Sequence, residues 1–511
     1  MALSFFLSRA SRRWLAALLA AAAIAAGVSA CAPSDPPADP PVLTAQLSPT
    51  ALGRPPEALE TATPAPPEGS ETDTRAHTPA PTGTATPTAQ AVVAPTLGYY
   101  NITPAADATL VTPIPTPVNP IQLNADLVNI LLIGTDYRAA ENGYRTDTLI
   151  IVSINTSTGF VTMLSIPRDL YVYVPTWGMS RINKAYHDGE KSHYAGEGPG
   201  LLKQTVLYNL GIPIHYYALA NFAGFRQIVD TVGGIEVPVN CQLTEYKIKD
   251  WSLDEADPNS YELYTQPMGV THMDGALALW YARARPVGGD FFRSYRQRQV
   301  LRALYHKGMR TNLIANIPEL YGDFNDVVQT DMGLWDIMQF APLTTKFDDA
   351  QIRSLHIGPN QTTPWVTPRG EDVLLPKPDA IQALVTEALT APSGNQLLRA
   401  LTPVEIWNGT TNADWDELAA ETLANEGFAP IIGQADGNAY ATTTIIDFTT
   451  SPKGSPIQKL QAYLHVEDPQ VITQPDSNNP TPFRVILGSD YNPCPRLDWM
   501  DNSSTTATPT P

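Results

Sequence analysis

Positive charge is scarce in this chain. Its 511 residues include 32 Lys and Arg against 51 Asp and Glu, which gives a formal net charge of −19. Proteins that bind nucleic acid normally carry a basic patch or stripe, because contacts with phosphates supply most of the affinity. The sequence shows no such stripe and no DNA-binding motif, so we expect no nucleic acid partner.

Cysteine is also scarce, with Cys31, Cys241 and Cys494 as its three occurrences. An oxidising compartment would permit a disulfide between Cys241 and Cys494. The two residues fall in different predicted domains, however, so two separate buried thiols are an equally good interpretation. The sequence leaves this pairing open.

The first 31 residues have the layout of an export signal. Arg9, Arg12 and Arg13 precede an apolar run, and "GVSAC" ends at Cys31. The run holds about 17 residues, near the lower limit for a membrane span. The small-small-Cys ending resembles a bacterial lipobox with Cys31 as the lipidated residue, and an uncleaved membrane anchor is the alternative. Both predict a protein tethered at the outer face of the cytoplasmic membrane.

Proline is abundant but unevenly placed, since 20 of the 48 prolines lie between residues 32 and 120. Thr and Ala accompany them, and no hydrophobic period survives. Such a segment buries too little apolar surface to offset its conformational entropy. We therefore predict that residues 32–122 form a disordered or polyproline II-like linker, and that the polar tail 496–511 is disordered too.

Residues 123–392 are predicted to fold as one α/β domain. "LVNILLIG" is an apolar run of strand length that ends at Gly134, which indicates a strand buried on both faces. "DTLIIVSIN", "GFVTMLSIP" and "HYYALA" are further strands, and "FAGFRQIVDTV" and "MDGALALWYA" are helices. Strands interleaved with helices predict a sheet covered on both faces.

Arginines gather at the ends of these elements despite the acidic background. Guanidinium groups suit phosphate oxygens, so this concentration predicts one anionic ligand at one site. The alternative is that these arginines form Arg–Asp pairs on the surface, each contributing ~0–1 kcal/mol. That alternative explains a single arginine well, but it explains six or more at element ends poorly. Asp290 is expected to cap the helix that carries the last of them. The candidates are Arg138, Arg145, Arg168, Arg181, Arg283, Arg285, Arg293 and Arg296, with Gln297 beside them.

Two aspartates lie among these arginines. We expect Asp136 just past the first strand and Asp147 at the opening of the second. If the strands pair side by side, the loop between them brings both carboxylates together. Two carboxylates beside arginines suit Mg²⁺ or Mn²⁺, because such ions share oxygen ligands with substrate phosphates. Taken singly, either aspartate could be an ordinary loop residue.

Seven ordered blocks carry a family resemblance between about Asn129 and Ile357. They are "NILLIGTDYR", "YRTDTLIIVSIN", "VTMLSIPRDLYV", "RINKAY", "GIPIHYYALANFAGFRQIVDTVGGIEV", "MDGALALWYARAR" and "DFFRSYRQRQVL". In that order they resemble the LytR-CpsA-Psr family of bacterial cell-wall phosphotransferases. The resemblance implies a three-layer α/β/α fold around a mixed central sheet. It also implies transfer of an anionic glycopolymer from a polyprenyl-pyrophosphate carrier to a peptidoglycan acceptor.

The resemblance also implies roles for individual residues. Asp136 and Asp147 would form the metal site, and Arg145 and Arg168 would join them in the catalytic set. The pyrophosphate would be bound by Arg138, Arg145, Arg168, Arg181, Arg283, Arg285, Arg293, Arg296 and Gln297. The chain departs from the family pattern in reading Arg296-Gln297-Arg298-Gln299 where a run of glutamines is common. "RINKAYHDGE" departs too, and both put acceptor or polymer contacts in question more than the core chemistry.

An apolar slot for the carrier's prenyl chain is expected from the helices. Leu201, Phe222, Phe225 and Trp280 could line it. In the alternative interpretation these side chains simply fill the core.

A second, smaller α/β domain is predicted at residues 400–495. Its order is strand, helix, strand, strand, helix, strand, and it resembles the C-terminal domain often appended in this family. No cluster of arginines or metal ligands marks it, so we interpret it as a binding or positioning module. Two alternatives for the whole chain stay open: a non-catalytic surface lipoprotein that binds lipid-linked or wall polymers, and a polyprenyl-pyrophosphate hydrolase.

Overall fold

The computed structural model describes residues 113–138, 143–255, 257–285, 289–310, 327–340, 352–392, 394–449 and 455–494. The predicted signal or anchor with Cys31, most of the linker and the C-terminal tail lie outside these ranges. Within them, no helix is long and apolar enough to cross a membrane.

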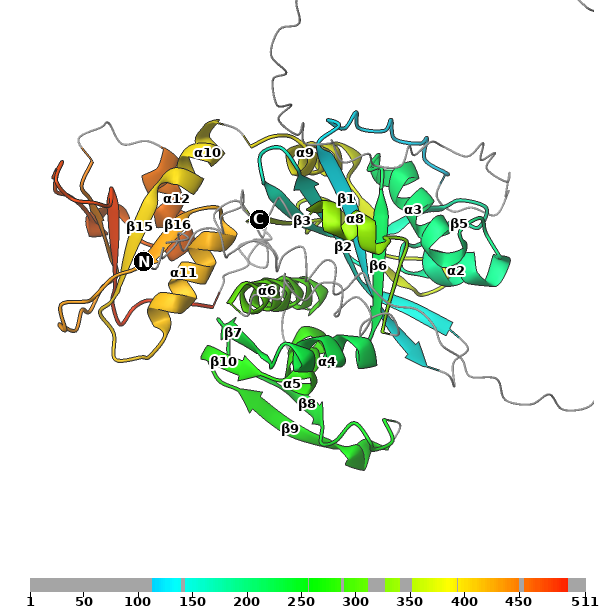
Figure 1. Cartoon of the computed structure of the whole chain (residues 1–511), viewed down its shortest axis with the longest axis horizontal. Coiled ribbons are helices and arrows are strands. Elements are labelled where there is room, and N and C mark those ends of the chain that lie inside the picture. The colour runs from blue at the N-terminus through cyan, green and yellow to red at the C-terminus, as the bar shows by residue number, and fades with distance from the viewer. Residues whose placement is uncertain are drawn as a thin grey trace, which may run out of the picture. The chain divides into compact units, whose positions relative to one another are not determined.

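A six-stranded mixed sheet forms the centre of the domain predicted at residues 123–392 (Figure 1). Its order is β11-β6-β1-β2-β3-β12, and the pairs β1–β6 and β3–β12 are parallel while the other pairs are antiparallel. The strands are β1 (Leu127–Arg138), β2 (Gly143–Asn155), β3 (Val161–Ser165), β6 (Tyr216–Asn221), β11 (Val328–Thr330) and β12 (Ile352–His356).

Helices cover both faces of this sheet. One face carries α4 (Phe222–Thr231), α5 (Gly275–Arg283), α6 (Gly289–Arg310) and α8 (Leu334–Phe340). The other carries α2 (Lys184–Ser192), α3 (Glu197–Leu210) and α9 (Pro378–Leu389). The predicted three-layer α/β/α fold is therefore confirmed.

Four short two-stranded sheets lie outside the central sheet in the described ranges. The pairs are β4 (Tyr171–Val174) with β5 (Gly178–Arg181), β7 (Ile235–Val239) with β10 (Gly269–Met273), β8 (Leu243–Ile248) with β9 (Tyr261–Gln266), and β13 (Thr362–Val366) with β14 (Asp372–Pro376).

The strands β1 and β2 extend beyond their predicted ends. Asp136 pairs with Arg145 inside the ladder, so neither residue lies in a loop. The register shifts between Gly134, opposite Thr148, and Thr135, opposite Thr146. Asp147 is therefore the extra residue of a β-bulge. The strands approach closely here, since a Cβ on Gly134 would lie 2.9 Å from that of Thr148.

The C-terminal domain has a five-stranded sheet in the order β16-β15-β19-β17-β18. Helices α11 and α12 supply most of the helical side chains of its separate core. A further strand, β18, joins the predicted series. The elements are α10 (Gly394–Leu401), β15 (Pro403–Asn408), α11 (Trp415–Asn425), β16 (Ala429–Ile432), β17 (Thr444–Asp447), α12 (Ser455–Leu464), β18 (Val471–Thr473) and β19 (Phe483–Leu487).

A disulfide links the two domains. Cys241, in the turn between β7 and β8, is bonded to Cys494 after β19, across 253 residues of sequence. The interpretation as two separate thiols is therefore wrong. Sequence could not decide the pairing, because it depends on how the C-terminal domain meets the β7–β8 turn.

Candidate active site

A cavity of about 460 Å³ lies between the central sheet and the helices α4, α5 and α6. The charged side chains of its lining are Asp136, Asp147, Arg168, Arg283, Arg285 and Arg293, with Gln297, and also Glu245 and Glu255 from β8 and the segment after it. Apolar side chains make up much of the rest, including Leu132, Ile150, Phe222, Phe225, Trp280 and Val300. Such a lining suits a ligand with an anionic head and an apolar tail.

The bulge in β2 explains why Asp147 reaches this cavity. In the regular part of β2, even-numbered residues such as Ile150 and Val152 pack toward α4–α6, and odd-numbered residues such as Ile151 pack toward α2 and α3. An odd-numbered Asp147 would face α2 and α3 in an unbroken strand. The extra residue reverses this alternation, and Asp147 lines the cavity together with Thr148.

Thr146 confirms the reversal. Its hydroxyl donates a 2.9 Å hydrogen bond to the carbonyl of Asn183, which directly precedes α2. An even-numbered residue thus faces the α2 side below the bulge. Asp136 keeps the regular alternation of β1 and lines the cavity beside Gly134.

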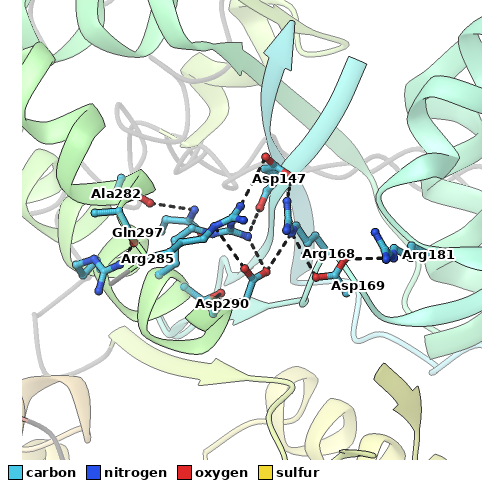
Figure 2. Close-up of polar contacts among 12 residues, drawn as sticks. Asp147, Arg168, Asp169, Arg181, Ala282, Arg285, Asp290 and Gln297 are labelled. Atoms are coloured by element: carbon cyan, nitrogen blue, oxygen red, sulfur yellow. Dashed lines mark hydrogen bonds and ion pairs between the residues drawn. The ribbon is translucent and has the colours of Figure 1, made fainter. Parts of the chain in front are cut away.

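Asp290 is the centre of the charged cluster (Figure 2). Its Oδ2 lies 2.7 Å from Arg293 Nη2 and 3.3 Å from Arg168 Nε, and its Oδ1 lies 3.6 Å from Arg285 Nε. Helix α6 begins at Gly289, so Asp290 sits inside the first turn and not in the predicted capping position before it. Burial raises the pKa of Asp290, although the charges of Arg168 and Arg285 oppose that rise.

Arg168 lies between Asp147 and Asp290 and contacts both. Its Nη1 donates a 2.7 Å hydrogen bond to Asp147 Oδ1, and its Nε also lies 3.3 Å from Asp169. Burial by itself would lower the pKa of Arg168, but the hydrogen bond to Asp147 and the charges of Asp147, Asp290 and Asp169 raise it. Arg168 therefore stays a cation, held in place by carboxylates on three sides.

Arg293 is the most deeply buried cation of the cluster, with 3 % of its side chain exposed. Its Nη2 binds Asp290 and the carbonyl oxygen of Asp147, at 2.7 and 3.1 Å. Among the described residues, its Nε and Nη1 have no hydrogen-bond partner. A buried cation with unused donors beside a cavity is the expected receptor for an anion.

The remaining predicted residues lie at different places relative to the charged cluster. Arg285 lies 3.9 Å from Asp147 Oδ2 and belongs to the cluster, and Gln297 lines the cavity and donates to the carbonyl of Ala282. Arg283 lines the cavity farther along, with its guanidinium 4.0 Å from the ring centre of Phe222. Arg138 and Arg145 have backbones in β1 and β2, but their side chains are outside the described part of the structure.

Arg296 and Arg181 do not line the cavity. Buried Arg296 donates to the carbonyl oxygens of Tyr281 and Ala284, so it ties α6 to the end of α5. Arg181 lies 3.5 Å from Asp169, one ion pair away from Arg168. A sequence places both at element ends but does not show which side of its element each occupies.

The sequence prediction missed the roles of Asp290 and Asp169 as shared counter-ions. An acidic residue at a helix start normally indicates a cap, and that reading hid the interaction of Asp290 with three arginines. Among the apolar residues expected in the slot, Phe222, Phe225 and Trp280 line the cavity. Leu201 does not, because it packs on the opposite face of the sheet.

A divalent ion would find two carboxylates here, those of Asp136 and Asp147. No group of three or more His, Cys, Asp or Glu side chains in the described ranges is arranged to hold a metal. Two carboxylates suffice for Mg²⁺ when a substrate supplies phosphate oxygens. The donor set therefore fits an ion shared with a phosphorylated ligand.

Family models match most of the folded chain. The model described as LytR_cpsA_psr family matches residues 103–387, and the one described as LytR cell envelope-related transcriptional attenuator matches residues 402–491.

Two curated relatives carry the same name, polyisoprenyl-teichoic acid--peptidoglycan teichoic acid transferase TagU. The protein from Oceanobacillus iheyensis is 35% identical over 236 residues, which cover 46% of this chain and 67% of the relative. The protein from Enterococcus faecalis is 30% identical over 250 residues, covering 48% and 74%.

Solved structures are also similar. The crystal structure of B. subtilis TagV is 27% identical, with a TM-score of 0.42, and the similarity covers 52% of this chain and 99% of that one. The structure of TagT bound to LI-WTA is 24% identical, with a TM-score of 0.40 and coverage of 54% and 96%. The first family model spans more than half of the sequence, and this chain belongs to the LytR-CpsA-Psr family.

Proposed function

We propose that this protein is an exported transferase that moves an anionic glycopolymer from a polyprenyl-pyrophosphate carrier onto peptidoglycan. The observation that carries the proposal is Arg293, a buried cation beside the cavity with two donor atoms that no described group binds. A pyrophosphate offers several acceptor oxygens to such a fork, and Arg285 and Arg168 lie close enough to share it. The names of the relatives support this choice, since those proteins are called polyisoprenyl-teichoic acid--peptidoglycan teichoic acid transferases.

The apolar part of the cavity supports a prenyl carrier. Phe222, Phe225 and Trp280 come from α4 and α5, and Leu132 and Ile150 come from the sheet. Burying prenyl carbons there would contribute about 25 cal/mol for each Å² of apolar surface removed from water. A soluble phosphosugar would gain nothing from this wall, so the cavity favours a lipid-linked donor.

The reaction follows from the charges around the head group. A hydroxyl oxygen of the acceptor attacks the phosphorus that bears the sugar. The bond from that phosphorus to the bridging oxygen breaks, and polyprenyl phosphate leaves with the electron pair. Asp136 or Asp147 accepts the hydroxyl proton. Arg168, Arg285 and Arg293 neutralise the charge that develops on the reacting phosphate and the leaving group.

Asp136 and Asp147 would hold Mg²⁺ or Mn²⁺ together with the pyrophosphate. Such an ion supplies positive charge for the leaving phosphate. Asp147 also accepts a hydrogen bond from Arg168, which fixes the carboxylate in the cavity wall. The metal requirement is part of the proposal.

The proposed location is the outer face of the cytoplasmic membrane, with the linker joining an N-terminal anchor to the catalytic domain. The signal layout ending at Cys31 supports this location. Labelling cells with a clickable fatty acid separates the two kinds of anchor. Incorporation lost in Cys31→Ala supports a lipoprotein, and label that survives the substitution removes that claim.

Mass spectrometry of lipids extracted from the purified protein tests the substrate class. A polyprenyl phosphate or pyrophosphate is the expected finding. Incubation with a lipid-linked glycopolymer, with and without peptidoglycan, then tests the reaction. Polymer attached to peptidoglycan supports transfer. Polymer released equally in both incubations indicates a hydrolase, and intact donor in both indicates a binding protein.

A further inference from the structure

Two faces of helix α6 make different contacts: one lines the cavity, and the other packs against other elements. Arg293, Gln297, Val300 and Leu301 line the cavity at helical spacing. Tyr295, Arg298 and Arg302, also at helical spacing, lie on another side of the helix. These three interact with Asn240, Ser165 and Glu421. One rigid element thus carries both the cavity residues and a second set of contacts.

The second face of α6 meets helix α11 of the C-terminal domain. Arg302 Nε lies 3.2 Å from Glu421 Oε1, and the two side chains are 2 % and 9 % exposed. Breaking such a buried pair by removing one partner leaves an uncompensated charge, and that is strongly destabilising. The position of α6 is therefore coupled to the position of α11.

Asn240 forms a second bridge beside this ion pair. Its Oδ1 accepts hydrogen bonds from Gln299 and Tyr295 of α6, at 2.5 and 3.4 Å. Its Nδ2 donates to the Leu418 carbonyl and the Thr422 hydroxyl of α11, at 3.4 and 3.3 Å. The next residue, Cys241, carries the disulfide to Cys494. The covalent link therefore holds the C-terminal domain where Asn240 joins the two helices.

The second face of α6 also contacts the end of β3, near Arg168 of the charged cluster. Arg298, which is buried, donates from Nη1 to Ser165 Oγ at 2.8 Å. Ser165 ends β3, three residues before Arg168. Helix α6 therefore carries Arg293 and also contacts the end of β3, close in sequence to Arg168.

We infer that the C-terminal domain acts as a positioning element for the pyrophosphate site, with Glu421 and Arg302 as positioning residues and the Cys241–Cys494 disulfide as the link that keeps α11 against α6. The inference rests on the proposed function, because it assigns a ligand to Arg293. It gives the appended domain a part in catalysis without any contact with substrate. A separate binding module would need no buried ion pair to α6.

Binding of inorganic pyrophosphate to the full chain, measured by calorimetry, tests the inference. Glu421→Gln should weaken the affinity about 2- to 30-fold, the range of coupling through a positioning contact. Glu417→Gln, on an exposed position one turn earlier in α11, should leave it unchanged. Replacing both partners in Arg302→Met/Glu421→Met should restore it, because apolar side chains of similar size can replace a buried ion pair.

A double-mutant cycle distinguishes positioning from general stability. In an Arg293→Ala background, Glu421→Gln should cause no further loss of affinity, because the residue it positions is gone. Normal affinity in Glu421→Gln together with weak affinity in Arg293→Ala overturns the inference and leaves the proposed function standing. Normal affinity in both overturns the pyrophosphate site itself.

The disulfide provides a second perturbation if Glu421→Gln does not fold. Cys241→Ser/Cys494→Ser removes the covalent link and leaves the cavity residues in place. Lowered pyrophosphate affinity in this variant supports the positioning role. Unchanged affinity in a folded variant overturns it.

Discussion

Asp290 and Arg293 lie one helical turn apart on α6, with Oδ2 of the carboxylate 2.7 Å from Nη2 of the guanidinium. The same carboxylate lies within ion-pair distance of Arg168 and Arg285. Three cations from three segments of the chain thus share one anion. Without it they would repel one another before any ligand arrived.

Asp290→Asn should lower kcat/KM for transfer roughly 10- to 100-fold while the protein stays folded. The amide keeps the shape of the side chain but removes the charge that holds three arginines together. Asp379→Asn is a matched control, since Asp379 is an exposed acid in the first turn of α9. Equal rates for Asp290→Asn and the control would show that the carboxylate does not organise the site.

Arg293→Ala should reduce transfer by roughly 10²–10³, as expected for loss of one charged donor from a preorganised site. Arg285→Ala and Asp147→Ala should have effects of the same order. Arg369→Ala, at an exposed position between β13 and β14, is the control. Steady-state rates and thermal unfolding should be measured for each variant. Near wild-type transfer by any folded variant removes that residue from the site.

Chelation of divalent ions should abolish transfer, and Mg²⁺ or Mn²⁺ should restore it. Asp136→Asn should raise the Mg²⁺ concentration needed for half-maximal rate, because one of the two carboxylates is lost. A metal titration of the rate for both proteins measures this effect. Full turnover in excess chelator would remove the metal from the mechanism.

The order of strands and helices was predictable from the hydrophobic patterns of the segments. The run "LVNILLIG" has residues that pack on both sides of the sheet, as a continuous apolar strand should. The bulge at Asp147 was not predictable, because nothing local in "YRTDTL" distinguishes a bulged strand from a regular one. Asp290 was misjudged for a related reason, since its partners Arg168 and Arg285 come from distant or irregular segments that only the tertiary fold brings together.

Stability should fall as the pH drops from about 6.5 to 4, partly because of His215. Burial and the charge of Lys203 lower the pKa of His215 to about 4, and Nδ1 accepts a hydrogen bond from the backbone N–H of Asn129. The unfolded chain protonates its histidine near pH 6.5, so the folded state binds fewer protons between these values and loses stability as the pH falls.

The loss attributable to His215 is about 3 kcal/mol, because its pKa falls from 6.5 to about 4 and each pH unit of that interval corresponds to about 1.36 kcal/mol. Denaturant unfolding at several pH values measures it. His215→Gln should make the profile less steep in this window, although His356, whose pKa burial also lowers to about 4, keeps part of the slope. Parallel profiles for wild type and His215→Gln would contradict the assignment.

Because of the bulge in β2, the site depends on the number of residues in this strand as well as on which residues they are. Deleting Thr146 would let β1 and β2 pair without a bulge, but Asp147 would then lie opposite Thr135 and face α2 and α3 instead of the cavity. The more regular hairpin would therefore lack a properly placed aspartate. When such chains are aligned or redesigned, a one-residue gap at this point is a change of chemistry and not a harmless difference in strand length.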